Sequence, residues 1–384
     1  MFQSAGTTVL AGLVLTMASG TAAAQQVTQA EQDQHVHVNQ IQVIGSHNSY
    51  HMGFAPSARK LLEEHHPKTL RSLDYKHAPL ADQLSSGVRQ IEIDIFNDPQ
   101  GGKFAHPAIE KMVAAAHLPP DPDFDPDHEM DKPGFKVMHV QDLDERSTCH
   151  TFVKCLTQVR DWSKQHPGHL PIFILVETKE GAPSEMPNAP KADVFTPQIF
   201  DAVDAEIRSV FQANEMITPD QVRGKSASLN EAIRTHGWPT LAEARGKVIF
   251  LLDQAHAGPV YAQGHPSLRG RLIFTNSQPG LSEAAFVEQN DGTKEAIDAL
   301  VKQGYLVRTR TDEGTEQART NDRTRLDRAL SSGAQILSTD YPPAEPSQWS
   351  SYVVQLPGGV VARCNPVSKP EGCVDSLLES PSTK

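Results

Sequence analysis

The chain has 384 residues, enough for one large α/β domain or for two domains of ordinary size. Its apolar fraction of 38% and its charged fraction of 21% are those of a globular protein, which argues against general disorder. The formal net charge of −12 argues against a nucleic-acid-binding protein and against strong electrostatic attachment to an anionic membrane, because both partners require a basic protein face.

The first 24 residues have the composition of a secretory signal peptide. The apolar run TVLAGLVLTMASG is too short to span a bilayer, and Ala22-Ala23-Ala24 fits a small-residue cleavage site. The run lacks a preceding lysine or arginine, which departs from the usual pattern. We expect a signal peptide over residues 1–24, a mature chain that begins near Gln25, and a secreted or periplasmic protein without a transmembrane segment.

Eight short apolar runs, most of them rich in β-branched residues, follow along the chain. Near-continuous apolar runs of this length are typical of strands that are buried on both faces of a parallel sheet. The predicted strands cover residues 41–45, 88–96, 135–140, 171–177, 247–253, 271–276, 305–310 and 334–340.

Amphipathic stretches of helical period separate several of these strands, at residues 155–167, 197–211 and 292–304. Eight strands that alternate with helices predict an α/β fold of the (β/α)8 TIM-barrel type. An open doubly wound sheet is the alternative, but the glycine-rich motif G-x-G-x-x-G of that fold is missing from the sequence. We expect one domain over residues 25–384, with the barrel core at about 41–345 and a C-terminal extension at 346–384.

Two long insertions are expected between predicted elements. Residues 97–134 are rich in proline and aspartate, and residues 179–198 hold four prolines. Loops of this length are usually functional lids or disordered inserts. Acids at every second position from Asp121 suggest an EF-hand, but Pro126 and Lys132 stand where such a loop needs glycine and glutamate. A solvated acidic loop is the better interpretation.

The four cysteines form two close pairs in the sequence. Cys149 and Cys155 are near one another, as are Cys364 and Cys373, so two local disulfides are the simplest of three possible connectivities. A zinc site is a weaker interpretation, because the sequence has no C-x-x-C pair. The second disulfide would staple the C-terminal extension.

Polar side chains interrupt or end the first four predicted strands. They are His47 and Asn48 after the first strand, Glu92 and Asp94 in the second, His139 in the third and Glu177 at the end of the fourth. Glu92 and Asp94 are two residues apart and therefore point to the same face of their strand. Any one of these residues alone would be interpreted as a buried side chain with its hydrogen bonds satisfied, or as a side chain exposed to solvent. Six on successive strands predict a functional site at the barrel mouth.

The oxygen donors in this group predict a site for one divalent cation. Two carboxylates that face inward together repel one another unless a cation lies between them. The donors Asn48, Glu92, Asp94 and Glu177 are hard ligands that suit Ca²⁺ or Mg²⁺ rather than Zn²⁺. An exported protein meets enough Ca²⁺ to fill a weak site. With His47 and His139 free for proton transfer, the group has what displacement at a phosphodiester requires.

Five segments together resemble a known family. They are GSHNSY, IEIDIF, MHVQD, ILVETK and STDYPP, and they look like the X-region half-barrel of calcium-dependent phosphoinositide-specific phospholipases C, particularly the secreted bacterial type. The resemblance covers about residues 41–345. It implies that His47 and His139 are the catalytic histidines and that Asn48, Glu92, Asp94 and Glu177 are the ligands of one Ca²⁺ ion.

The resemblance also implies the reaction. The inositol 2-hydroxyl, activated by Ca²⁺ and a base, attacks phosphorus and expels diacylglycerol, which leaves a cyclic inositol phosphate. His139 would protonate the leaving oxygen, and His47 would stabilise the phosphoryl oxygens. The base is Glu92, Glu177 or a histidine.

Other polar residues near the predicted mouth are candidates for substrate contact. The candidates are Lys179, Arg308, Arg310, Asp340 and Tyr341. A phosphate would suit any of the three cations. The carboxylate would bind sugar hydroxyls, and the aromatic ring would cover the inositol. The two arginines are equally well explained by an ion pair with Asp312 or Glu313.

The expected partner is a phospholipid head group at a membrane surface, and the protein is expected to be a monomer. Because the sequence contains no separate membrane-targeting module, the barrel rim would make the contact with the membrane.

A glycerophosphodiester phosphodiesterase is one alternative function, since that family shares the barrel and the E-x-D and E-x-K strands. That family follows its first histidine with Arg-Gly, however, whereas this chain has Asn48-Ser49. A non-catalytic binder of head groups or polysaccharide is another alternative, but it would not need both His47 and His139.

Overall fold

The computed structural model describes residues 1–4, 6, 27–184 and 186–379. The cleavage site and the apolar run of the expected signal peptide lie outside these ranges, so that prediction is not addressed by the structure. Within the ranges, no helix combines the length and the apolar character that crossing a bilayer requires.

Eight parallel strands form a nearly closed barrel in the order β5-β4-β3-β2-β1-β8-β7-β6. A single parallel bridge between Asn276 and Phe286 links β5 to β6 and closes the remaining side. The barrel strands are β1 (Ile41–Ser46), β2 (Gln90–Ile95), β3 (Ile172–Thr178), β4 (Val248–Leu252), β5 (Ile273–Thr275), β6 (Phe286–Glu288), β7 (Leu306–Arg310) and β8 (Ile336–Thr339). The prediction of a (β/α)8 barrel is confirmed.

The prediction is wrong about one of the eight strands. Residues 135–140 belong to the long connection between β2 and α6 (Phe152–Gln165), where Lys136 forms only isolated bridges with Phe96 and Thr151. Phe135 and Val137 of this run are buried, and a short buried apolar run is not distinguishable from a strand by its pattern. The barrel strand that the prediction lacks is β6, which has three residues.

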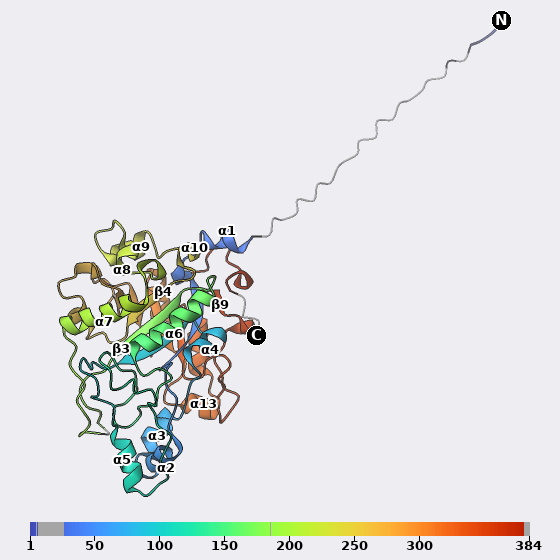
Figure 1. Ribbon diagram of the computed structural model, residues 1–384. Helices are drawn as coiled ribbons and strands as arrows, with labels where there is room; N and C mark the ends of the chain where they lie inside the picture. The colour runs from blue at the N-terminus through green and yellow to red at the C-terminus, as the bar shows by residue number, and fades with distance from the viewer. Residues whose placement is uncertain (5, 7–26, 185, 380–384) are drawn as a thin grey trace.

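Helices surround the barrel and extend beyond it (Figure 1). The α-helices are α1 (Gln29–Asp33), α2 (Pro56–His65), α3 (Pro67–Leu73), α4 (Leu80–Ser85), α5 (Ala108–Ala115), α6, α7 (Pro197–Val210), α8 (Pro219–Arg223), α9 (Leu229–Thr235), α10 (Leu241–Ala244), α11 (Gly258–Tyr261), α12 (Lys294–Lys302), α13 (Glu316–Thr320) and α14 (Thr324–Ser331). Short 3-10 turns are η1 (Val38–Gln40), η2 (Ala213–Glu215), η3 (Pro266–Leu268), η4 (Pro357–Gly359) and η5 (Asp375–Leu377).

The three helices predicted from amphipathic stretches are α6, α7 and α12. In each of them a threonine accepts a hydrogen bond from the backbone N–H three residues further on, which satisfies a free donor of the first turn; these are Thr151, Thr196 and Thr293. Beyond α12, Gly304 adopts φ 94°, a left-handed conformation that favours glycine and turns the chain towards β7.

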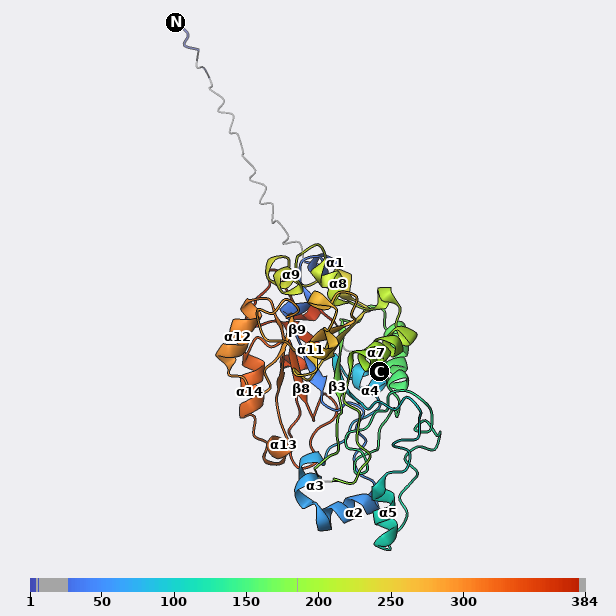
Figure 2. The same cartoon turned by 90° about the vertical axis from the view of Figure 1, so that its left-hand side faces the viewer.

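Helices α2, α3 and α5 form a lobe at one end of the molecule, opposite α1, α8 and α9 (Figures 1 and 2). The lobe is built from the connections that follow β1 and β2, so it stands at the carboxyl ends of the barrel strands. It has a small apolar core of its own, made of Ala58, Leu61, Leu62, Leu70, Ile109, Val113 and Leu143. The predicted acidic loop is only partly solvated, because the buried Asp125 accepts hydrogen bonds from the backbone N–H groups of Glu129 and Met130.

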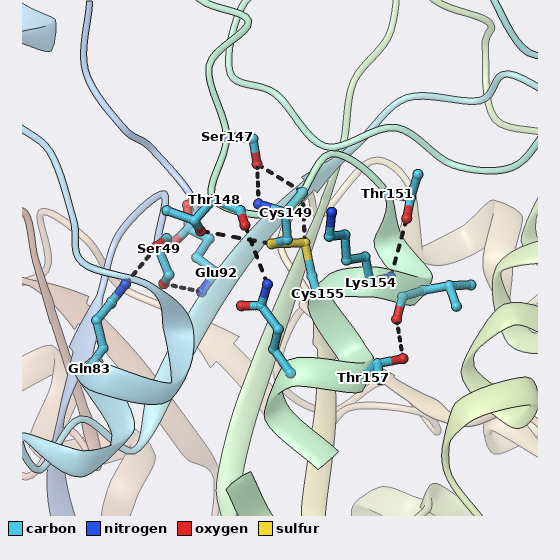
Figure 3. The surroundings of a disulfide bond; sticks show 12 residues. Ser49, Gln83, Glu92, Ser147, Thr148, Cys149, Thr151, Lys154, Cys155 and Thr157 are labelled. Atoms are coloured by element: carbon cyan, nitrogen blue, oxygen red, sulfur yellow. Dashed lines mark hydrogen bonds between the residues drawn. A yellow bond between two sulfur atoms is a disulfide. The ribbon is translucent and has the colours of Figure 1, made fainter. Parts of the chain in front are cut away.

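Both expected disulfides are present, Cys149–Cys155 and Cys364–Cys373. The first is fully buried where the chain enters α6 (Figure 3). The second belongs to the C-terminal extension, in which β9 (Ala362–Cys364) pairs antiparallel with β1.

Candidate active site

The segment GSHNSY makes a tight exit from β1. A Cβ atom on Gly45 would lie 2.0 Å from the side chain of Gln90, so glycine allows β1 and β2 to approach closely. Ser49 then fastens the chain to β2: its N–H donates to the carbonyl of Glu92 at 3.0 Å, and its Oγ accepts from the N–H of Glu92 at 2.8 Å. Asn48 takes a left-handed conformation with φ 47°, which turns the chain at the barrel mouth.

Strands β2 and β3 bring two carboxylates together. Asp94 and Glu177 are register partners, and the Nζ of Lys179 lies 2.7 Å from an oxygen of each. Burial raises the pKa of Asp94, and the charge of Glu177 raises it further. Burial also opposes ionisation of Glu177, but the adjacent Lys179 ammonium outweighs it and lowers the pKa of that carboxyl.

Three carboxylates form a compact group of oxygens at the mouth. One oxygen from each of Glu92, Glu177 and Asp253 lies within 4.8 Å of the other two. Asp253 directly follows β4 and was missed, although it closes the predicted strand 247–253 as Glu177 closes its own. Asp94 is not part of this compact group, and its Oδ1 is buried without a hydrogen-bond partner among the described residues.

These residues fit a hard divalent cation. The buried Oδ1 of Asn48 accepts no hydrogen bond from the part of the chain that the structure describes, while its Nδ2 donates to the hydroxyl of Tyr75 at 2.8 Å. Burial raises the pKa of Glu92 to about 8 despite its ion pair with Arg308. A divalent cation would supply the missing partner of the amide oxygen and the charge that favours ionised carboxylates.

His47 is held by a carboxylate on each side of its ring. Its Nδ1 is 2.7 Å from Oδ1 of Asp340, which follows β8, and its Nε2 is 3.5 Å from Oε1 of Glu92. The Tyr75 hydroxyl lies 3.4 Å from the same Nδ1. Burial lowers the pKa of His47, and Arg310 and Arg308 lower it further.

His139 comes from a turn in the long β2–α6 connection and not from a barrel strand. Its Nδ1 is 3.0 Å from the buried carboxylate of Asp144, and the turn is closed by a bridge between Val140 and Asp144. Burial lowers the pKa of His139, and the nearby Lys179 contributes in the same direction. The turn thus carries His139 to the same mouth as the residues of β1, β2 and β3.

The lysine and the two arginines that were predicted to bind substrate all have buried acidic partners. Arg308 donates from Nη2 to Oε2 of Glu92 at 2.5 Å, and its Nη1 is 3.3 Å from Glu288. Arg310 lies 3.2 Å from Asp340 and 3.9 Å from Asp312. The alternative partner, Glu313, is bound by Arg325 instead.

A cavity of about 810 Å³ adjoins this mouth on the side of His47. It lies between the connection after β1 and the residues after β8, and its lining includes Arg59, Tyr75, His77, Asp340, Tyr341 and Glu345. Tyr341 is buried, and its hydroxyl has no hydrogen-bond partner in the described ranges. Tyr75 and Asp144 were not predicted; Tyr75 lies in a loop without a distinctive pattern, whereas Asp144 follows His139 by only five residues.

The fold is shared with known phospholipases. A calcium-dependent phosphoinositol-specific phospholipase C from Pseudomonas sp. matches with a TM-score of 0.52 at 16% identity, over 87% of this chain and 96% of the other. A myoinositol complex under the same description matches with a TM-score of 0.51 at 17% identity, over 86% and 96%. A Ca²⁺-dependent phosphatidylinositol-specific phospholipase C from Streptomyces antibioticus has a TM-score of 0.48 at 19% identity, over 79% and 95%.

A search of the curated proteins found no match. The family model described as phosphoinositide phospholipase C, Ca²⁺-dependent, matches residues 36–366, which include the whole barrel. The chain therefore belongs to the Ca²⁺-dependent phosphoinositide phospholipase C family, phosphodiesterases that cleave phosphatidylinositol.

Proposed function

We propose that His47 and His139 are the catalytic histidines of this enzyme and that its mouth holds one Ca²⁺ ion. The proposal rests on one observation: two imidazoles, each bound through Nδ1 to a buried carboxylate, lie at the mouth where carboxylate oxygens cluster. The ligands would be Asn48, Glu92, Asp94, Glu177 and Asp253. When bound, Ca²⁺ would neutralise phosphoryl charge and make the inositol 2-hydroxyl more acidic.

The protein side chains would then carry out the proton transfers. Asp340 and Asp144 accept from Nδ1 of His47 and His139, so both histidines direct Nε2 away from their carboxylates. The 2-hydroxyl oxygen attacks phosphorus, and its proton passes to Glu92, to Glu177 or to His47, whose Nε2 lies 3.5 Å from Oε1 of Glu92. The phosphorus–glycerol oxygen bond breaks, and His139, in its imidazolium form, gives its Nε2 proton to the leaving diacylglycerol oxygen and becomes the neutral Nδ1–H ring. The product is a cyclic inositol phosphate.

The substrate would be bound by its head group at a membrane surface, and the enzyme would act as an exported monomer. The apolar leader composition and the two disulfides support export, because disulfides persist in oxidising compartments. The cavity beside Asp340 and Tyr341 supports head-group binding on that side of His47. The residues proposed to contact inositol are Lys179, Arg308, Arg310, Asp340 and Tyr341.

The reaction is tested by identifying the products from phosphatidylinositol and from glycerophosphoinositol by phosphorus NMR, each with Ca²⁺ and with a chelator. Diacylglycerol and cyclic inositol phosphate are expected from the lipid, and only with Ca²⁺. Release of glycerol phosphate from glycerophosphoinositol as the main reaction would support a glycerophosphodiester phosphodiesterase instead.

The histidine roles are tested by His139→Ala and His47→Ala. Each should lower kcat by about 100-fold or more, because one proton-transfer group contributes about 10²–10⁴-fold. Circular dichroism and the thermal midpoint check that the variants fold. A folded His139→Ala enzyme with full activity would remove this residue from the mechanism.

A further inference from the structure

A second, fully buried histidine contacts the carboxylate that holds His139. Nε2 of His51 lies 3.0 Å from Oδ1 and 2.9 Å from Oδ2 of Asp144, whose Oδ2 is 3.0 Å from Nδ1 of His139. The side chains of His51 and Asp144 are 0% exposed, while that of His139 is 15% exposed. The three groups form a chain that runs from the protein interior to the mouth.

The protonation pattern of this chain follows from its contacts. Burial opposes ionisation of Asp144, but the charge and hydrogen bonds of His51 and His139 outweigh it and hold the pKa of the carboxyl well below its usual value. An ionised carboxylate only accepts hydrogen bonds, so both imidazoles must donate to it. The neutral form of His139 is thereby fixed as the Nδ1–H tautomer, so Nε2 is the nitrogen that takes up the proton and passes it to the leaving oxygen.

His51 is suited to a fixed role and not to proton transfer. Its Nδ1 is buried without a hydrogen-bond partner among the described residues, so Nε2 is the ring nitrogen through which His51 acts, as a donor to Asp144. The ring is enclosed by Tyr75 at 4.8 Å and Phe54 at 6.3 Å between centroids, and by His139 at 5.9 Å.

The backbone joins the same two segments. His51 and Ser147 form an antiparallel bridge, and the N–H of Thr148 donates to the carbonyl of Tyr50 at 2.8 Å. The turn that carries His139 is thus attached to the segment that leaves β1, four residues after His47. The contact between His51 and Asp144 fixes the orientation of the carboxylate within this attachment.

We propose that His51 is a positioning residue for the phosphodiesterase reaction, which through Asp144 sets the tautomer and orientation of His139. The inference rests on the proposed role of His139 as the general acid. His51 supplies one of the two N–H donors to a buried carboxylate. Without it, Asp144 keeps a single partner and no longer holds the His139 ring in one orientation.

Two substitutions of His51 separate positioning from packing. His51→Leu removes the donor and should lower kcat for monomeric short-chain phosphatidylinositol about 10- to 100-fold with little change in KM, the range typical of residues that orient a functional side chain from behind. His51→Gln keeps an N–H donor near the position of Nε2 and should retain most of the activity. The matched controls are His169→Leu and His169→Gln, because His169 is buried before β3 and bonded to Ser163 and Leu170. They should change stability but not kcat.

The wild-type enzyme provides a second measurement, in which the tautomer is observed in the unmodified site. In ¹⁵N-histidine-labelled protein, at a pH at which the His139 ring is neutral, this ring, assigned by its loss in His139→Ala, should show the Nδ1–H tautomer. The Nε2–H tautomer, or a folded His51→Leu enzyme with unchanged kcat, would overturn the inference. Full activity of folded His139→Ala would instead refute the proposed function on which the inference rests.

Discussion

The ammonium group of Lys179 lies between two carboxylates at the mouth of the barrel. It is 2.7 Å from Asp94, whose side chain is 0% exposed, and 2.7 Å from Glu177. Both carboxylates are proposed ligands of Ca²⁺. Lys179 therefore carries positive charge in the place where the metal charge is required, and the two cations compete for the same oxygens.

Lys179→Met should destabilise the Ca²⁺-free enzyme and increase the stabilisation that Ca²⁺ provides. Removing one partner of a buried ion pair typically costs about 3–5 kcal/mol, because it leaves an uncompensated charge, and a bound cation would restore much of that loss. Calorimetry in EGTA and in saturating Ca²⁺ measures both effects. Lys191→Met, an exposed lysine of the same connection, is the control. A Ca²⁺-induced shift in Tm equal to that of the wild type would show that Lys179 does not compete with the ion.

At the residue scale, spacing along predicted strands identified most of the proposed site. Glu92 and Asp94 share a face because strand side chains alternate, and Glu177 is next to Asp94 because parallel strands place their carboxyl ends together. The pairing of Arg308 with Glu92 depends on contact between distant strands of the closed barrel and has no local sequence signal. The same holds for Tyr75 and for the contact between His51 and Asp144.

At the element scale, the β2–α6 connection is the least predictable part of the fold. Its apolar run at residues 135–140 is buried as a strand would be, but it makes only isolated bridges. The barrel still has eight strands, because the short β6 takes the remaining place. His139 lies near the mouth even though the predicted strand is wrong, since the connection returns across the carboxyl ends of the strands.

The Cys149–Cys155 disulfide anchors this connection where it enters α6 (Figure 3). A Cys149→Ser/Cys155→Ser variant should lose about 2 kcal/mol of stability, as the entropy of closing so short a loop suggests. It should also lose activity, because the His139 turn lies just before the bond. Denaturant unfolding and kcat are the measurements.

The Cys364→Ser/Cys373→Ser variant is the matched control, because that disulfide lies in the C-terminal extension and not in the β2–α6 connection. It should lose stability with little change in kcat. Equal loss of kcat in both variants would mean that the first disulfide has no specific role in holding the His139 turn.

Helix α7 packs against the same connection through Glu206. Its Oε1 accepts from the backbone N–H of Phe135 at 3.0 Å, while its Oε2 is buried without a partner in the described chain. Burial raises the pKa of this carboxyl from 4.5 to about 7. At a pH between 4.5 and about 7, Glu206 is protonated in the folded protein but ionised in the unfolded chain. Protonation of Glu206 therefore contributes its full amount to the free energy of unfolding below pH 4.5, and this contribution is lost as the pH rises through about 7.

Glu206→Gln should remove this dependence. The free energy of unfolding of the variant should fall less than that of the wild type between about pH 5 and pH 8, the interval in which Glu206 releases its proton. Urea unfolding at a series of pH values measures the difference. Glu64→Gln, an exposed position, is the control. Parallel curves for the wild type and Glu206→Gln would mean that Glu206 titrates normally.

At the scale of the whole molecule, the net charge of −12 opposes approach to the substrate, because phosphatidylinositol makes a membrane surface anionic. At the mouth itself, Lys179, Arg308 and Arg310 are paired with buried carboxylates and contribute little net positive charge. If the barrel rim acts at a bilayer, as proposed above, it would approach the surface against a long-range repulsion. The range of this repulsion shrinks from about 30 Å at 0.01 M salt to about 8 Å at 0.15 M.

Raising the salt concentration over this interval, at constant free Ca²⁺, should increase the rate on phosphatidylinositol vesicles about two- to fivefold, because weaker repulsion lets more enzyme reach the surface. The rate on monomeric short-chain substrate should change much less, since that reaction requires no approach to a charged surface. Vesicle co-sedimentation at the same salt concentrations separates binding from turnover. A rate on vesicles that falls with salt would mean that a local basic surface, and not the net charge, governs attachment to the membrane.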